Sequence, residues 1–234
     1  MRRAHVYDWQ SLVLRERRAL PFWLAASLAR SMADMSHNRP RVLVVDYDPS
    51  WPDTFEVLRR GVWAAVYDIA LAVEHVGSTG VPGLAAKPVI DMDVIVTSRD
   101  EVPEVIVRLG ALGYLHQGNL GIEDREAFRS PEGLPAHHLY VCPEGGTALA
   151  NHLALRDFLR RNPAAAAEYG RIKKQLAAQF PHDMDGYISG KTNYILATLR
   201  SAGFPESVLQ TIKGAQPRGD SAPRPLKQAL AGRH

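Results

Sequence analysis

The feature that most constrains this chain is a pair of aspartates inside an apolar run. Residues 89–96 read Val-Ile-Asp-Met-Asp-Val-Ile-Val, which has the length and β-branched composition of a buried strand. In a strand, Asp91 and Asp93 point to the same face, with Cα atoms roughly 6.6 Å apart. Two buried carboxylates side by side are costly without a compensating cation. The pattern therefore predicts a cation at this strand.

A divalent metal ion is the simplest such cation. One or two carboxylates can hold Mg²⁺ or Mn²⁺, and the phosphate oxygens of a ligand complete the shell. Upstream, Gly77 and Ser78 follow another apolar segment, where backbone amides and a hydroxyl can approach a phosphate closely. We therefore expect Asp91 and Asp93 to bind the metal, and Gly77 and Ser78 to bind a phosphorylated ligand. The alternative is an exposed strand edge whose aspartates face water.

The apolar spacing predicts a mixture of helices and strands. The expected helices are residues 55–69, 102–112, 149–159, 169–180 and 188–202, and the expected strands are residues 70–76, 89–96 and a segment that begins near His138. The polar, glycine-rich segment 118–135 is expected to hold short strands at best. This order indicates an α+β protein with a small mixed sheet, flanking helices and a helical C-terminal part.

The two ends of the chain differ in charge from the segment between them. Residues 1–40 carry seven arginines against three acids, and residues 214–234 carry four basic side chains against one acid. The body, residues 41–213, has 17 basic and 21 acidic side chains. An acidic body argues against a strong nucleic-acid surface and favours a small-molecule partner beside the nucleotide.

The composition also sets the expected organisation and location. We expect residues 1–40 to form a leader, disordered or partly helical, residues 41–205 one domain, and residues 206–234 a disordered basic tail. No run of 18 apolar residues occurs, so no membrane span is expected. Residues 19–29 have some likeness to the apolar core of a signal peptide; the alternatives are an amphipathic leader or a later start at Met35. The single cysteine fits a reducing, cytoplasmic compartment.

The motifs around the two aspartates resemble those of the GrpB family, also called UPF0157, within the nucleotidyltransferase superfamily. The likeness covers about residues 44–204 and is carried by Asp46-x-Asp48-Pro49-x-Trp51-Pro52, Glu74-His75-Val76-Gly77-Ser78-Thr79, Lys87-Pro88-x-Ile90-Asp91, His137-His138-Leu139, His152-Leu153-x-Leu155-Arg156-Asp157 and Gly190-Lys191. The resemblance implies a nucleotidyltransferase-like fold. From the two carboxylates and the Gly-Ser turn we expect Mg²⁺ or Mn²⁺ as cofactor and a nucleoside triphosphate as co-substrate.

One position departs from the wider superfamily. Active transferases carry a third carboxylate on a later strand, whereas the corresponding strand here begins His137-His138-Leu139-Tyr140. We expect His138 or Tyr140 to occupy the third position, or Glu74 on the neighbouring strand to supply the oxygen. An imidazole can bind a metal, but it suits softer ions than Mg²⁺.

Five basic side chains are candidates for binding the phosphates or ribose of a nucleotide: Lys87, Arg125, Arg129, Arg156 and Lys191. Each has a purely structural alternative. The two lysines can be solvated or lie at a helix start without touching an anion. Arg125 and Arg129 can form surface ion pairs, and Arg156 can form a salt bridge to Asp157 or Asp91.

The leading hypothesis is a Mg²⁺-dependent nucleotidyltransferase that acts on an unknown small-molecule acceptor, with Asp91, Asp93, His138 and Glu74 as its catalytic residues. The alternative is a non-catalytic regulatory module that binds a nucleotide or coenzyme. The missing third carboxylate and the fusions of family members to dephospho-coenzyme A kinase favour this alternative. A metal-dependent hydrolase of a phosphorylated small molecule is a third hypothesis.

Overall fold

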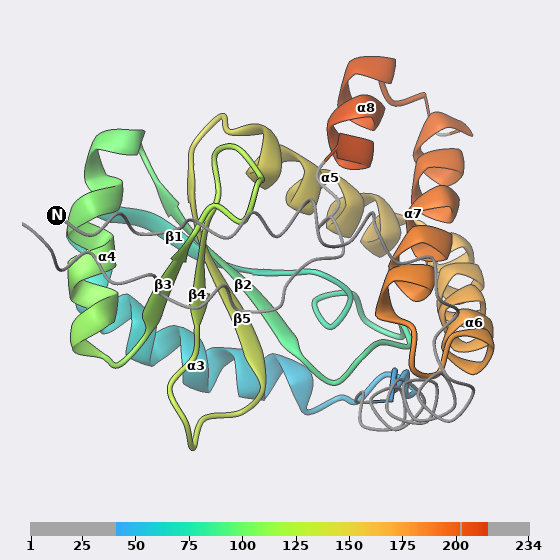
Figure 1. Cartoon of the computed structure of the whole chain (residues 1–234), viewed down its shortest axis with the longest axis horizontal. Helices are drawn as coiled ribbons and strands as arrows, with labels where there is room; N and C mark the ends of the chain where they lie inside the picture. The colour runs from blue at the N-terminus through green and yellow to red at the C-terminus, as the bar shows by residue number, and fades with distance from the viewer. Residues whose placement is uncertain (1–40, 202, 215–234) are drawn as a thin grey trace, which may run out of the picture. The chain divides into compact units, whose positions relative to one another are not determined.

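A five-stranded sheet forms the centre of the described part of the chain (Figure 1). The structure is a computed structural model that describes residues 41–201 and 203–214. The predicted leader, residues 1–40, and residues 215–234 of the predicted tail lie outside the described residues.

The sheet mixes parallel and antiparallel pairs. Its strands, in spatial order, are β1 (Ala70–Val76), β2 (Ile90–Val96), β5 (His137–Pro143), β4 (Glu126–Arg129) and β3 (Leu115–Gly118). Strands β2 and β5 are parallel, and the other neighbouring pairs are antiparallel. The last strand in the sequence therefore lies in the middle of the sheet.

Helices cover both faces of the sheet because successive side chains of β2 point to opposite faces and both faces carry buried apolar residues. Met92, Val94 and Val96 point to one face and pack in the main core with α3 (Trp51–Val66) and α4 (Val102–Ala111). On the opposite face, Ile95 packs with Cys142 of β5 and with α5 (Thr147–Arg161). Asp91 and Asp93 share this second face, so the aspartates lie on the side of the sheet that carries α5.

The C-terminal part is helical, as predicted. After α5 come α6 (Pro163–Gln179), α7 (Met184–Ser201) and α8 (Glu206–Gly214). A second core cluster joins these helices to the loop between β1 and β2 through Val81 and Leu84. The loop and α6 approach closely at Gly170, where a Cβ atom would lie 3.3 Å from the backbone nitrogen of Ala85.

The predicted α+β class, small mixed sheet and flanking helices are confirmed. The Gly-Ser turn lies between β1 and the aspartate-bearing β2, as predicted. Two details differ from the sequence-based expectation. Strand β3 was not expected, and α8 lies beyond residue 205, where a disordered tail was predicted to begin. The short strand β4 agrees with the expectation for residues 118–135. No helix among the described residues is long and apolar enough to cross a membrane.

Candidate functional site

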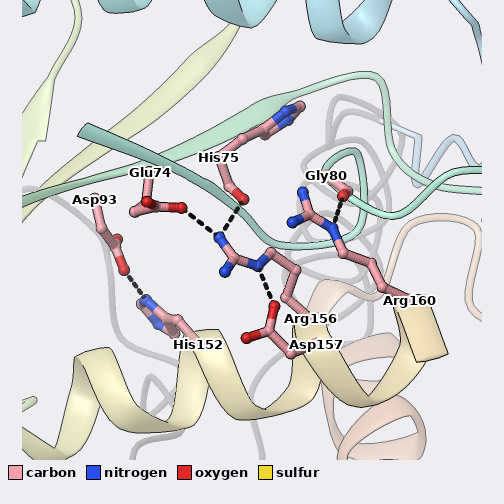
Figure 2. A network of polar contacts seen from close by, with 8 residues as sticks. All are labelled: Glu74, His75, Gly80, Asp93, His152, Arg156, Asp157 and Arg160. Atoms are coloured by element: carbon pink, nitrogen blue, oxygen red, sulfur yellow. Dashed lines mark hydrogen bonds and ion pairs between the residues drawn. The ribbon is translucent and has the colours of Figure 1, made fainter. Parts of the chain in front are cut away.

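Each of the two aspartates on β2 accepts a hydrogen bond from a histidine. His138 of β5 donates from Nδ1 to Asp91 Oδ1 at 2.8 Å. His152 of α5 donates from Nδ1 to Asp93 Oδ2, also at 2.8 Å (Figure 2). The repulsion between the two carboxylates is therefore offset by two imidazoles that come from different elements.

The two carboxylates differ in burial. Asp93 is fully buried, and its Oδ1 atom has no hydrogen-bond partner among the described residues. Asp91 is part-exposed at a cavity wall. Burial alone would raise the pKa of Asp91, but the hydrogen bond and charge of His138, together with Lys191, hold it below the ordinary value. Asp91 is therefore ionised at neutral pH.

His152 responds to the buried carboxylate beside it. Burial alone would lower the pKa of His152, but the charge of Asp93 and its hydrogen bond to the ring raise the pKa above its ordinary value. The raised pKa favours the protonated ring, which makes the contact between His152 and Asp93 an ionic one.

The Gly-Ser turn lies directly against the aspartate strand. Gly77 has a φ of +67°, and a Cβ atom at this position would collide with the carboxylate of Asp91. The turn therefore needs glycine for two reasons, the left-handed backbone and the close approach of Asp91. Ser78 follows at the wall of the same cavity.

A cavity of about 490 Å³ adjoins this turn and receives side chains from the sheet and from the C-terminal helices. It brings together most of the residues that the sequence singled out: Gly77, Ser78, Lys87, Asp91, Arg125, His138, Arg156 and Lys191. Asp93 lies behind the wall and reaches it through His152. Glu74 is likewise outside the lining and is bonded to Arg156, which lines the cavity. Among the described residues, Arg129 is the predicted site residue that remains outside the lining without such a link.

Arg156 and Glu74 bind each other. The guanidinium donates to Glu74 Oε2 at 2.7 Å, to the backbone oxygen of His75 at 3.1 Å, and through Nε to Asp157 Oδ1 at 2.8 Å (Figure 2). Glu74 is thus engaged as a counter-ion rather than presented as a third carboxylate for a metal. The alternative interpretation of Arg156, a salt bridge to Asp157, matches the structure.

Strand β5 provides aromatic and imidazole groups at the third position. The parallel register sets His138 opposite Asp91 and Tyr140 opposite Asp93. The guanidinium of Arg125 lies over the ring of Tyr140, 4.5 Å from its centroid. Burial, and the nearby charge of Asp91, raise the pKa of Tyr140, so its phenol is neutral at physiological pH.

The residues present fit a divalent ion that arrives with its ligand. The described residues contain no group of three or more His, Cys, Asp or Glu side chains that could hold a metal by themselves. However, Asp93 keeps one buried oxygen without a partner, and Asp91 lies at the cavity wall. Two carboxylates are sufficient for Mg²⁺ when phosphate oxygens and water complete its octahedral shell.

Two residues at the site were not among the predicted site residues. The sequence named His152 only within the motif that also contains Arg156, and its contact with Asp93 depends on how α5 packs on the sheet. Lys173 of α6 is 1% exposed and lines the cavity, although the sequence did not predict it as a site residue. A signal was present, since Lys173 follows Tyr169 by four residues and precedes Ala177 by four, which places it on the buried face of its helix.

Comparison with known proteins identifies several relatives of this chain. The family model described as GrpB protein matches residues 41–201. The UPF0157 protein YqkA of Bacillus subtilis is 36% identical over 66% of this chain, and the match spans 45% of YqkA. A UPF0157 protein of Streptomyces coelicolor is 34% identical over 68% of this chain and 82% of its own length. A dephospho-CoA kinase of Mycobacterium bovis is 28% identical over 80% of this chain and 52% of its own length.

Solved structures give the same grouping. The crystal structure of the conserved protein GrpB from Enterococcus faecalis matches with a TM-score of 0.60 and 33% identity, over 69% of this chain and 100% of that one. A chain of the Cid1 poly(U) polymerase also matches, at 12% identity and a TM-score of 0.40 over 64% of this chain and 48% of that one, which is too distant to bear on activity. The family model and the curated relatives agree with the motifs around Asp91 and Asp93. The chain belongs to the GrpB family.

Proposed function

We propose that this protein binds a nucleoside triphosphate together with Mg²⁺ and transfers the nucleotidyl group to a small-molecule acceptor. The observation that carries this proposal is the placement of Asp91 and Asp93 on one face of β2, beside a Gly-Ser turn and a cavity with basic walls. Carboxylates on one side and cations on the other are the arrangement that a metal-bound phosphate chain requires.

In this proposal the aspartates and the turn have separate roles. Asp91 and Asp93 hold the metal ion, which when bound neutralises charge on the transferred group. The backbone amides of Gly77 and Ser78, with the serine hydroxyl, bind phosphate oxygens. His138, held by Asp91, lines the cavity where other transferases present a third carboxylate, and there it contacts the ligand or the acceptor.

The basic residues of the cavity bind and orient the ligand. Lys87 and Lys191 supply positive charge to the phosphates from the loop and from α7. Arg125, stacked on Tyr140, offers a planar cation for a phosphate or the ribose. Arg156, which Glu74 and Asp157 already neutralise, positions α5 against β1 and presents little free charge.

The acceptor in this proposal is a small molecule rather than a nucleic acid. The body of the chain is acidic, with 17 basic against 21 acidic side chains in residues 41–213. An extended phosphate backbone would meet repulsion over most of such a surface, while one basic pocket can still take a nucleotide. We place the reaction in the cytoplasm because the one cysteine, Cys142, is free and buried.

A second function has its own support. Both aspartates already accept hydrogen bonds from histidines, and the described residues hold no three-ligand metal cluster. This arrangement favours a module that binds a nucleotide or coenzyme without turning it over. The relatives named dephospho-CoA kinase connect this alternative with a coenzyme ligand.

Titration calorimetry with ATP, with and without MgCl₂, separates the two functions. We expect ATP to bind the wild type at least about tenfold more tightly with Mg²⁺ than without it, and Asp91→Asn to lose this gain, because one metal ligand loses its charge. Asp100→Asn, an exposed aspartate away from the cavity, is the matched control and should bind as the wild type does. A metabolite pool added to wild type and ATP should release pyrophosphate.

The opposite outcome is equally definite. ATP binding that is independent of Mg²⁺, unchanged in Asp91→Asn and without pyrophosphate release from any metabolite pool contradicts nucleotidyl transfer. That result supports the binding module.

A further inference from the structure

Lys173 is a buried amine without a polar partner. Its side chain is 1% exposed, and no described residue forms a hydrogen bond with Nζ. Its Nζ atom lies over the ring of Tyr169 on the same helix, 4.5 Å from the ring centroid. A buried ammonium is costly when nothing accepts its hydrogen bonds. A group of this kind at a cavity wall is a candidate for function.

The surroundings of Lys173 decide its charge. The titratable and charged groups nearest to it are Tyr169 on its own helix, Lys191 on α7 and Asp91 on β2, and the loop before β2 and α5 add Lys87 and Arg156 to the same cavity. Burial, together with the nearby charge of Lys191, lowers the pKa of Lys173 to about 7, although Asp91 acts in the opposite direction. The amine therefore changes between its neutral and charged forms near physiological pH.

The cavity has an excess of positive side chains. Lys87, Lys173, Lys191 and Arg125 line it, whereas Asp91 is the carboxylate at its wall among the described residues. The three lysines come from three different elements, the loop before β2, α6 and α7, so they surround the space rather than meet at one point. Such a distribution suits several linked anionic groups better than one.

We propose that Lys173 and Lys191 form a metal-independent subsite for the phosphate chain of the ligand, and that Lys173 takes up a proton when this anion binds. The inference rests on the proposed function in one respect, that the cavity takes a phosphorylated ligand. A bound phosphate oxygen supplies the acceptor that Nζ lacks, and its negative charge favours the ammonium over the amine. The proton comes from solvent, and no bond to the ligand forms or breaks.

In the unliganded protein, the neutral amine avoids the cost of an unpaired buried charge. In the complex, the ammonium pairs with the anion, so proton binding and ligand binding support each other. The subsite thereby binds the phosphate chain more weakly as the pH rises above neutral, even though the ligand becomes more negative.

The test uses inorganic tripolyphosphate and the full chain in EDTA, so that no metal contributes. Calorimetry at pH 8.5 in two buffers of different ionisation enthalpy gives the number of protons exchanged on binding. We expect the wild type to take up about one proton more than Lys173→Met, because the free amine is almost fully deprotonated at that pH. At pH 7, Lys173→Met should bind tripolyphosphate about tenfold more weakly than the wild type.

Lys174→Met is the matched control. Lys174 is the next residue on α6, part-exposed and paired with Asp46, so the same substitution there should leave affinity and proton uptake at the wild-type values. A thermal melt confirms that each variant is folded, and Lys173→Gln replaces Lys173→Met if the methionine variant does not fold. Equal proton uptake in wild type and the Lys173 variant overturns the proposal, as does the same loss in Lys174→Met.

Two further arms separate this subsite from nucleotidyl transfer. Asp91→Asn should bind metal-free tripolyphosphate at least as tightly as the wild type, because a repelling carboxylate is removed, although it binds ATP with Mg²⁺ more weakly. Inorganic phosphate should bind far more weakly than tripolyphosphate; equal affinity contradicts a subsite for a phosphate chain. If tripolyphosphate binds but no nucleotidyl transfer is detected, the subsite is supported and the proposed transferase activity is refuted. If transfer is detected but metal-free tripolyphosphate does not bind, the subsite alone is refuted.

Discussion

Gly77 shows how closely backbone and carboxylate pack at this site. Alanine at this position would need a left-handed backbone and would collide with Asp91, whereas Gly83, with a φ of +78°, has nothing within 4 Å of its missing Cβ. We expect Gly83→Ala to lower the free energy of unfolding by about 1 kcal/mol and Gly77→Ala by about 3 kcal/mol. Urea denaturation measures both, and equal losses would show that Asp91 can move aside freely.

Lys173 makes the stability of the protein depend on pH. Its pKa in the folded state is about 7, below the ordinary 10.5, so the cost of charging the buried amine is fully present below pH 7. Between these values the unfolded state binds more protons, and wild-type stability rises with pH. Lys173→Met should therefore be more stable than wild type by several kcal/mol at pH 6 and by clearly less at pH 9. Thermal melts at both values measure this, and a constant difference contradicts it.

At the scale of elements, Arg156 ties α5 to β1. Its side chain is 9% exposed, while that of Glu74 is 39% exposed. We expect a double-mutant cycle with Glu74→Gln and Arg156→Met to give a coupling of about 1–2 kcal/mol in urea unfolding. The exposed pair Glu168 and Arg171, on one helix, serves as comparison and should couple by about 0.5 kcal/mol or less. Equal coupling energies for the two pairs would mean that the burial of Arg156 does not strengthen its ion pair with Glu74.

The elements that the sequence predicted well have strong internal periodicity. Strand β2 is apolar except at two positions of equal parity, and the alternation sends Met92 and Asp93 to opposite faces whatever the rest of the chain does. Strands β3 and β4 have four residues each, too few to show a period, and depend on pairing, β4 with β5 and β3 with β4. Helix α8 is short and borders a proline-rich tail, so composition argued against it.

The placement of site residues beside one another could be derived from the sequence where these residues are close in the chain. Gly77, Ser78 and Asp91 are joined by one loop between adjacent strands, so a local motif brings them together. The contact of His152 with Asp93 and the burial of Lys173 depend on helices that pack from far along the chain. Neither secondary-structure propensities nor local sequence motifs say how these distant helices pack on the sheet.

At the scale of the whole molecule, the cavity brings together two parts of the chain that contribute side chains of opposite charge. The carboxylates come from β2, while Lys173 and Lys191 come from α6 and α7. The basic ends of the chain lie mostly outside the described residues, so the acidic body remains the basis for expecting a small-molecule partner. The helical C-terminal part thus supplies Lys173 and Lys191 to the proposed binding site, in addition to forming a core cluster of its own.

The central position of β5 has a consequence for how the protein is made. While the chain leaves the ribosome, β1 and β2 emerge as one ribbon and β3 and β4 as another, and neither two-stranded unit is stable in water by itself. Only when residues 137–143 have been synthesised can a strand insert between the two ribbons and join them. Cooperative folding of the sheet is therefore delayed until β5, the last of its five strands in the sequence, has been translated, and the nascent chain exposes unpaired strand edges until then.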